Sequence, residues 1–540
     1  MRQFRLQCAS GVLVRHSRQR ANGGFRSVAI AAFLMLGCLL PVAHAGDPVV
    51  IRIASQPVTT IAAGFSGVNA PQPRNGVEYF DPKFIAAVTP LNTGWVRYPG
   101  GTVSLAFDWT TGHMNIGWMN SLIDGNPPLV TGQSAKILTI SQQLTQAKGG
   151  VLFSDFVTFA RTLNASAILC FNSFTDNNAG SATLMALTAR RWGLNVVEWE
   201  LGNEAYFYPL IPGFQTAAIY AGSSNDYFND ISTGAPYAAV GLFPAGLYPG
   251  VSGDFTNWDL GLQSYSPQYW TAASNHIYPI VGTQTAKDTI WALNGILAHG
   301  SSDYINSYLV PLMGANTPIF ITELNCCSSY SNKFLSYLYN GIFLAEYTAR
   351  LSAVPNVKAV GVNSLYTENS DYHGLIQSVD DFESYLLNQV AADPGYSTNT
   401  AINPNTQFQF YTSAPGLAMQ VANLAINSGK RIWPTIVVGG PTVDITGFDG
   451  NPIPAVYAQA YLADNGRHHL LITNKCAEAQ LVAIELDGAK VQGTLIVTYV
   501  TNSSPLAANT AQSPTNVRIQ TMTSSNPIRL AKYSVTTVTW

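Results

Sequence analysis

The sequence predicts an α/β fold: a (β/α)8 TIM barrel followed by a C-terminal antiparallel β-sandwich domain. Between residues 61 and 428, short apolar runs alternate with segments of helical periodicity, which is the pattern of a parallel sheet with crossover helices. Eight such runs can be counted, the number that closes a parallel barrel. From about residue 432 the chain changes to short runs between Gly, Asn, Asp and Pro, which is typical of a sandwich.

The individual elements follow from the same patterns in chain order. The eight barrel strands are expected at residues 61–68, 95–98, 166–171, 196–201, 238–243, 270–277, 318–321 and 357–365. Helices are expected at residues 82–88, 150–163, 181–192, 214–221, 255–263, 285–312, 333–351 and 416–427. Residues 105–135 read as a long loop, and residues 371–408 as a loop with one inserted helix. Sandwich strands are expected at residues 435–438, 456–461, 468–474, 480–486, 494–500 and 534–540.

The domain boundaries are set by composition. Residues 1–45 have the features of a secretion signal: an Arg-rich, acid-free segment, an apolar run, and a small-x-small cleavage site that ends at Ala45. Residues 46–60 contain a strand that can join the sandwich, residues 61–428 form the barrel, and residues 429–540 form the sandwich. Cys38 faintly resembles a lipoprotein cleavage site, so a lipid anchor stays open as an alternative to release.

The charge of the chain argues against polyanionic partners. The signal segment holds six of the 27 basic residues and no acidic one, so the remaining chain carries 21 basic and 30 acidic residues, a net charge of −9. Such a balance disfavours nucleic acid and anionic membrane surfaces. Charged residues make up only 11% of the chain, and a neutral surface rich in amides and hydroxyls suits carbohydrate.

Four cysteines follow the signal segment: Cys170, Cys326, Cys327 and Cys476. In an oxidising compartment they allow three full pairings, between which the sequence does not choose. A bridge from Cys170 to Cys326 or Cys327 is possible if both strand ends surround one mouth of the barrel. The spacing lacks a CxxC pair and the histidines are scattered, so no metal site is expected.

Two glutamates carry the candidate chemistry. Glu204 follows the fourth expected strand in a Gly-Asn-Glu turn, and Glu323 follows the seventh in the segment Thr322-Glu323-Leu324. In a parallel barrel the carboxyl ends of the strands form one mouth, where catalytic residues gather. Retaining glycosidases need two carboxyl groups about 5–5.5 Å apart, one as nucleophile and one as acid/base. The positions of the two glutamates therefore favour cleavage of glycosidic bonds.

Together with its neighbours, this pair of glutamates gives the chain a resemblance to a known group. The matching elements are Asn203-Glu204 after strand four, Glu323 after strand seven, Arg97 after strand two, and His276-x-Tyr278 after strand six. With these residues the chain resembles the clan A glycoside hydrolases, which are retaining enzymes on a (β/α)8 barrel, and looks nearest to families 39, 51 and 79. The segment Arg97–Gly101 is similar to the Arg-aromatic-Pro-Gly-Gly of arabinofuranosidase-like members, and Leu169–Asn172 also fits these families.

The resemblance implies a role for each residue. Glu204 resembles the acid/base and Glu323 the nucleophile. Asn203 would bind the sugar 2-hydroxyl, Tyr278 would donate to the nucleophile, and Arg97 would hold it ionised. The remaining two expected substrate-binding residues are His276 and Asn172, which would line the sugar site.

The resulting prediction is a secreted or periplasmic retaining O-glycoside hydrolase. It would act on polysaccharide or glycoconjugate by double displacement, with arabinofuranosidase-, xylosidase- or glucuronidase-like specificity, and with carbohydrate as its partner. This chemistry requires no cofactor and no metal. The alternative is a non-catalytic carbohydrate-binding protein on the same fold. The segment after Tyr366 contains no Arg or Lys, which favours neutral sugars over uronic acids.

Overall fold

The computed structural model describes residues 49–56, 59–70, 77–117, 132–148, 151–176, 180–208, 211–245, 255–280, 285–299, 304–329, 331–368, 371–380, 382–393, 395, 409–443, 445 and 452–540. The expected signal segment, with Cys38 and Ala45, lies outside these residues. None of the helices in this described part of the chain combines the length and the hydropathy needed to cross a lipid bilayer.

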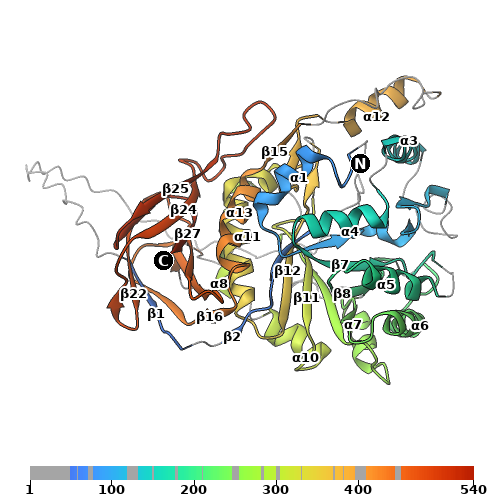
Figure 1. Ribbon diagram of the computed structural model, residues 1–540, viewed down its shortest axis with the longest axis horizontal. Coiled ribbons are helices and arrows are strands. Elements are labelled where there is room, and N and C mark those ends of the chain that lie inside the picture. Colours follow the sequence, from blue (N-terminus) through green and yellow to red (C-terminus); the bar gives the residue numbers. More distant parts are fainter. Residues whose placement is uncertain are drawn as a thin grey trace, which may run out of the picture. The chain divides into compact units, whose positions relative to one another are not determined.

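Eight parallel strands close into a barrel, as the sequence predicts (Figure 1). In chain order they are β3 (Ser66–Asn69), β4 (Trp95–Tyr98), β7 (Ser166–Phe171), β8 (Val196–Leu201), β9 (Val240–Leu242), β10 (Ala272–Ile277), β11 (Ile319–Leu324) and β12 (Val357–Asn363). Each strand pairs with its neighbour in sequence, and β12 pairs with β3 to close the ring. All eight carboxyl ends therefore meet at one mouth.

Helices follow the strands and cover the outside of the barrel (Figure 1). They are α1 (Pro82–Val88), α4 (Phe153–Thr162), α5 (Ser181–Arg191), α6 (Ala217–Gly234), α7 (Phe255–Ser264), α8 (Ala286–His299), α10 (Val310–Met313), α11 (Leu338–Ser352) and α13 (Ala414–Ile426). Two further helices, α3 (Gly132–Lys148) and α12 (Phe382–Ala392), pack on each other through Ile137, Ile140, Leu144, Leu386 and Val390. The sequence predicts α12 as the inserted helix but does not predict α3, whose apolar residues contribute to this small separate cluster.

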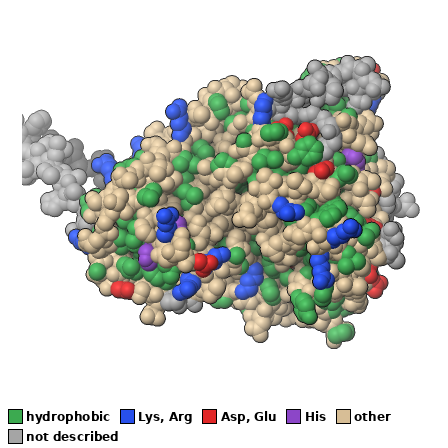
Figure 2. Space-filling model, viewed as in Figure 1, with side chains coloured by type: hydrophobic (Ala, Val, Ile, Leu, Met, Phe, Trp, Pro, Cys, Tyr) green, Lys and Arg blue, Asp and Glu red, His purple; other side chains and the backbone are tan. Residues whose placement is uncertain are grey.

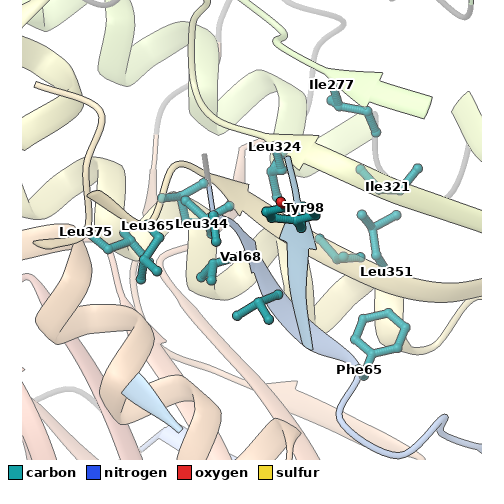
Figure 3. Close-up of a cluster of buried hydrophobic side chains, with 14 of the residues drawn as sticks. Phe65, Val68, Tyr98, Ile277, Ile321, Leu324, Leu344, Leu351, Leu365 and Leu375 are labelled. Atoms are coloured by element: carbon teal, nitrogen blue, oxygen red, sulfur yellow. The ribbon is translucent and has the colours of Figure 1, made fainter. Parts of the chain in front are cut away.

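The main core lies between the strands and the surrounding helices. Figure 3 shows part of it, where Val68 and Ile321 of the barrel strands lie near Leu344 and Leu351 of α11. Inside the barrel a second, smaller cluster is built around Trp95, with Ile168, Ala272, Phe320 and Ala359 from other strands. Trp95 fits because β3 and β12 carry glycine beside it. A Cβ on Gly67 or on Gly361 would lie 2.1 Å from an atom of its indole ring.

The C-terminal part of the chain forms a sandwich of two sheets. One contains β17 (Thr435–Val438), β1 (Val49–Ile53), β22 (Gln480–Leu486), β23 (Ala489–Lys490) and β26 (Ile528–Leu530). The other contains β2 (Thr59–Thr60), β16 (Arg431–Trp433), β20 (Val456–Leu462), β21 (His468–Asn474), β27 (Ser534–Thr539), β24 (Leu495–Thr501) and β25 (Arg518–Ser524). Strand β1 thus joins the sandwich, where it runs parallel to β22 (Figure 1).

Three short pairings complete the described strands. They are β5 (Phe107–Asp108) with β6 (His113–Met114), β18 (Thr442–Val443) with β19 (Ile453–Pro454), and the sheet of β13 (Tyr366–Thr367), β14 (Ile376–Ser378) and β15 (Phe410–Thr412).

A buried ion-pair network links the barrel to the sandwich. Glu346 of α11 binds Nζ of Lys475 at 2.6 Å, the hydroxyl of Thr473 at 2.6 Å and the guanidinium of Arg350 at 2.7 Å. The side chains of Glu346 and Lys475 are fully buried. Burial alone would raise the pKa of Glu346, but the charges of Lys475 and Arg350 outweigh it and lower the pKa. The carboxylate therefore stays charged inside this interface.

The surface agrees with the composition. On the face shown in Figure 2, Lys, Arg, Asp and Glu side chains are scattered, and uncharged atoms cover most of the area. No large patch of a single charge is visible on that face.

Candidate active site

Arg97 lies at the centre of the polar cluster at the barrel mouth. Its Nε donates to Oε2 of Glu200 at 2.6 Å, one terminal nitrogen donates to Oε1 of Glu323 at 2.6 Å, and the other donates to Oδ1 of Asn203 at 2.8 Å. The side chains of Arg97 and Glu200 are fully buried, and that of Glu323 is 6% exposed. Burial would lower the pKa of Arg97, but Glu200 and the other anionic groups raise it, so the guanidinium is permanently charged.

Glu323 is held as a carboxylate. Besides Arg97, its oxygens accept hydrogen bonds from the amides of Asn69 and Asn363, each at 3.2 Å, and from the hydroxyl of Tyr278 at 2.5 Å. Burial alone would raise its pKa, but the charges of His276 and Arg97 and the bond from Tyr278 together lower it. An ionised, precisely oriented carboxylate at the mouth is a suitable nucleophile.

Glu204 lies in a turn of unusual backbone geometry. Gly202 has φ 77° and Glu204 has φ 47°. A side chain at positive φ is uncommon and costs about 1–3 kcal/mol, and such residues cluster at functional sites. The Glu204 side chain is 16% exposed, and its Oε1 lies 2.8 Å from Nδ1 of His276 and 3.4 Å from the hydroxyl of Tyr206. Of the two glutamates, Glu204 is therefore the one that solvent reaches more easily.

His276 sets the distance between the two carboxylates. Its Nδ1 lies 2.8 Å from Oε1 of Glu204 and 3.7 Å from Oε2 of Glu323, so these two oxygens are no farther apart than the sum of the distances, 6.5 Å. Burial would lower the pKa of His276, but Glu323 and Glu204 raise it. Both carboxylates therefore favour the protonated form of the imidazole that lies between them.

In the side-chain amide of Asn203, the oxygen is hydrogen-bonded and the nitrogen is not. Its Oδ1 accepts from Arg97, whereas its buried Nδ2 has no hydrogen-bond partner in the described structure. A buried amide donor without a partner costs about 1–3 kcal/mol. Its position directly before Glu204 makes it suited to bind a ligand hydroxyl.

Of the seven residues that the sequence singled out, six lie in one connected cluster. They are Arg97, Asn203, Glu204, His276, Tyr278 and Glu323. Asn172 is separate from this cluster. Its amide nitrogen donates to the carbonyl of Phe107 and the hydroxyl of Thr175, and its carbonyl accepts from the backbone of Phe174 and Thr175. The side chain therefore stabilises the turn after β7.

Three residues of the cluster were not selected from the sequence: Asn69, Glu200 and Asn363. Asn69 and Asn363 are the last residues of β3 and β12, and the amide of Asn363 also lies 2.6 Å from the hydroxyl of Tyr278. Glu200 lies one residue before the end of the expected fourth strand. Their position near the carboxyl ends of predicted strands was the available signal, since that is where a barrel gathers its polar side chains.

The four described cysteines are free thiols. The possible bridge from Cys170 to Cys326 or Cys327 is therefore not formed. Instead, the thiol of Cys170 lies 3.0 Å from the carbonyl oxygen of Gly202 and 3.2 Å from the hydroxyl of Ser104. Burial raises the pKa of this thiol to about 12. Within the described residues, no group of three or more His, Cys, Asp and Glu side chains is arranged to hold a metal ion.

Comparison with known proteins finds similar folds among solved structures. No protein-family model and no curated protein matches the sequence. Among solved structures, an α-L-arabinofuranosidase from Thermotoga maritima in complex with arabinose matches with a TM-score of 0.62 at 17% identity, over 91% of this chain and 99% of that one. A family 51 α-L-arabinofuranosidase from Thermotoga petrophila matches with a TM-score of 0.64 at 17% identity, over 91% and 100%.

A third match is a 4-O-α-L-rhamnosyl-β-D-glucuronidase from Fusarium oxysporum, with a TM-score of 0.56 at 15% identity, over 91% of this chain and 100% of that one. At such identities the likeness shows the fold. The chain therefore has the barrel-and-sandwich fold of these glycoside hydrolases along nearly its whole described length.

Proposed function

We propose that this chain is a retaining glycoside hydrolase whose nucleophile is Glu323 and whose acid/base is Glu204. The observation that carries the proposal is the pair of carboxylates bridged by His276, with an oxygen of each no more than 6.5 Å from the other, the sum of 2.8 and 3.7 Å. Inverting enzymes place their carboxyl groups about 6.5–9.5 Å apart and retaining enzymes about 5–5.5 Å apart. The distance limit fits the retaining class better than the inverting class, and the fold shared with glycoside hydrolases agrees with this assignment.

The environments of the two glutamates support different roles. Glu323 is nearly buried, paired with Arg97 and bonded to Tyr278, so it is ready to attack the anomeric carbon. Glu204 is more exposed and is not paired with Arg97, so it can protonate the departing glycosidic oxygen. It then takes a proton from the water that hydrolyses the glycosyl-enzyme intermediate. The unpartnered Nδ2 of Asn203 would bind the sugar 2-hydroxyl.

The substrate that fits best is a neutral sugar, such as an arabinofuranoside or xyloside. A uronic acid needs a cationic partner for its carboxylate. Among the described residues that contact Glu204 or Glu323, the arginine is Arg97, and its nitrogens already bind Glu200, Glu323 and Asn203. Residues 1–45 would direct the enzyme to secretion, where polysaccharide and glycoconjugate substrates are found.

The decisive experiment uses a panel of aryl glycosides with wild-type protein, Glu204→Ala and Glu323→Ala. We expect wild type to hydrolyse at least one neutral aryl glycoside with retention, and Glu323→Ala to be inactive. For an activated substrate, azide should restore turnover to Glu204→Ala and give a glycosyl azide of retained configuration. A wild type that binds sugars but cleaves none would instead indicate a carbohydrate-binding protein, and equal activity of all three proteins would refute both assignments.

A further inference from the structure

Two further carboxyl groups lie inside the barrel beneath the two glutamates. Glu198 and Glu200 are two residues apart on β8, so both side chains project from the same face of the strand. Both residues are fully buried. Burying a carboxyl group costs free energy unless the group is paired or protonated. The presence of two such groups here therefore needs a physical explanation.

Glu200 is bound to Arg97, whose contacts connect it to the proposed site. Its Oε2 accepts from Nε of Arg97 at 2.6 Å. The nitrogens of a guanidinium lie in one plane at fixed angles, so a partner that fixes Nε also fixes the direction of the two terminal nitrogens. In Arg97 those nitrogens bind Glu323 at 2.6 Å and Asn203 at 2.8 Å. The position of Glu200 therefore determines where two groups of the proposed site receive their hydrogen bonds.

Glu200 also competes with Glu323 for the positive charge of Arg97. A single guanidinium here faces two carboxylates, Glu200 and Glu323, each at 2.6 Å. An opposite charge at this distance lowers the pKa of a carboxylate by about 1–3 units. A nucleophile bound by the whole of that charge would be a weaker base, and hence a weaker attacking group, than one that shares it.

We propose that Glu200 is a positioning residue for the reaction, which orients Arg97 and divides its charge so that Glu323 is held ionised yet nucleophilic. This inference rests on the proposed glycosidase function, but Glu200 itself touches neither Glu204 nor any reacting atom. It acts through Arg97.

Glu198 provides the matched control. It lies on the same face of the same strand, but its Oε1 accepts from the hydroxyl of Ser274 at 2.8 Å. Gly241 leaves space for it, because a Cβ there would lie 2.4 Å from that oxygen. Burial and the neighbouring charge of Glu200 raise the pKa of Glu198, which favours its neutral form. Glu198→Gln replaces this side chain by an uncharged one of nearly the same shape that does not contact Arg97.

The experiment measures the pH dependence of kcat/KM for wild type, Glu200→Gln, Glu200→Asp and Glu198→Gln on the best aryl glycoside. In Glu200→Gln the side-chain oxygen can still accept from Arg97, but the charge is gone. We expect the midpoint of the acid limb of its kcat/KM profile to move to lower pH by about one unit. We also expect its kcat to fall about tenfold or more. Glu200→Asp keeps the negative charge but has a shorter side chain, which orients Arg97 less well. The acid limb of its kcat/KM profile should therefore stay at the wild-type pH while its kcat falls. Glu198→Gln should match wild type in both.

Several results would overturn the inference. An acid limb and a kcat in Glu200→Gln equal to those of wild type would do so, as would the same downward shift in Glu198→Gln. If circular dichroism shows that Glu200→Gln does not fold, Glu200→Asp decides, and a wild-type kcat in that variant refutes the role. A wild type that cleaves no glycoside removes the proposed function and this inference together. An active wild type with an unaffected Glu200→Gln removes this inference alone.

Discussion

His276 and Glu323 face each other on neighbouring barrel strands, with Nδ1 of the imidazole 3.7 Å from Oε2 of the carboxylate. The same nitrogen lies 2.8 Å from Oε1 of Glu204, which follows a strand farther round the ring. One imidazole therefore spans the gap between the two glutamates. Its position depends on the strand order of the barrel, because β9 pairs with both β8 and β10 and so brings their carboxyl ends close together.

The hydroxyl of Tyr278 should tune the basicity of Glu323. It donates to Oε2 of that carboxylate and is one of the groups that lower its pKa. In Tyr278→Phe this donor is lost, so we expect the pKa of Glu323 to rise, the acid limb of kcat/KM to move to higher pH, and kcat to fall about 10-fold to 100-fold. The measurement is a pH–rate profile on an aryl glycoside. Tyr269→Phe, which loses a bond to the backbone of Ala221, should leave the profile unchanged.

The stability of the fold should depend on pH through His276. Its folded pKa is raised above the usual value, against the effect of burial, by Glu323 and Glu204. The stabilisation is therefore fully present below the unfolded pKa of about 6.5 and is lost as pH rises through the folded pKa. We expect His276→Asn to lower the free energy of unfolding more at about pH 5 than at about pH 9. Urea titrations at both pH values test this, and a loss that is equal or larger at alkaline pH would contradict it.

A methyl group inside the barrel should be poorly tolerated beside Trp95. In Gly67→Ala the new Cβ would lie 2.1 Å from Cδ2 of the indole. Such overpacking costs about 1–3 kcal/mol or more, so the thermal midpoint should fall clearly. Gly222→Ala on α6 is the control, because outside its own stretch of helix the nearest atom to its Cβ would be Oη of Tyr265, at 3.9 Å. There, alanine should be neutral or stabilising by up to about 1 kcal/mol. Partial rescue of Gly67→Ala by Trp95→Leu would confirm the steric cause.

The ion pair between Lys475 and Glu346 should matter for the attachment of the sandwich to the barrel. Both side chains are fully buried and 2.6 Å apart. Lys475→Met leaves part of the Glu346 charge uncompensated, and breaking a buried pair in this way costs about 3–5 kcal/mol. Because Arg350 and Thr473 still bind Glu346, we expect the lower end of that range, measured by urea unfolding. The exposed Lys358→Met should change stability by about 0.5 kcal/mol or less. Equal effects of the two variants would contradict the prediction.

The fold class and the strand ends that carry polar residues can be predicted from the sequence alone. Alternating strands and helices were visible because the periodicity of apolar residues is a local property. Glu204 and Glu323 could be selected for the same reason, since each follows its own apolar strand. The other four residues of the cluster, Arg97, Asn203, His276 and Tyr278, were predicted from the resemblance to clan A glycoside hydrolases. The fold that the apolar patterns predict agrees with the structure.

The contacts between side chains follow from the three-dimensional fold and cannot be predicted from local sequence. Nothing local in the sequence shows that Glu200 binds Arg97 or that Asn69 and Asn363 both donate to Glu323. Nor does it show that the side chain of Asn172 is hydrogen-bonded within its own turn. Nor does it show that β1 pairs with β22, more than 400 residues away, or that α3 packs on α12. These contacts depend on the register of strands and on ring closure, which are set by the packing of residues distant in sequence. A pattern read along the chain gives the positions of polar groups but not their partners.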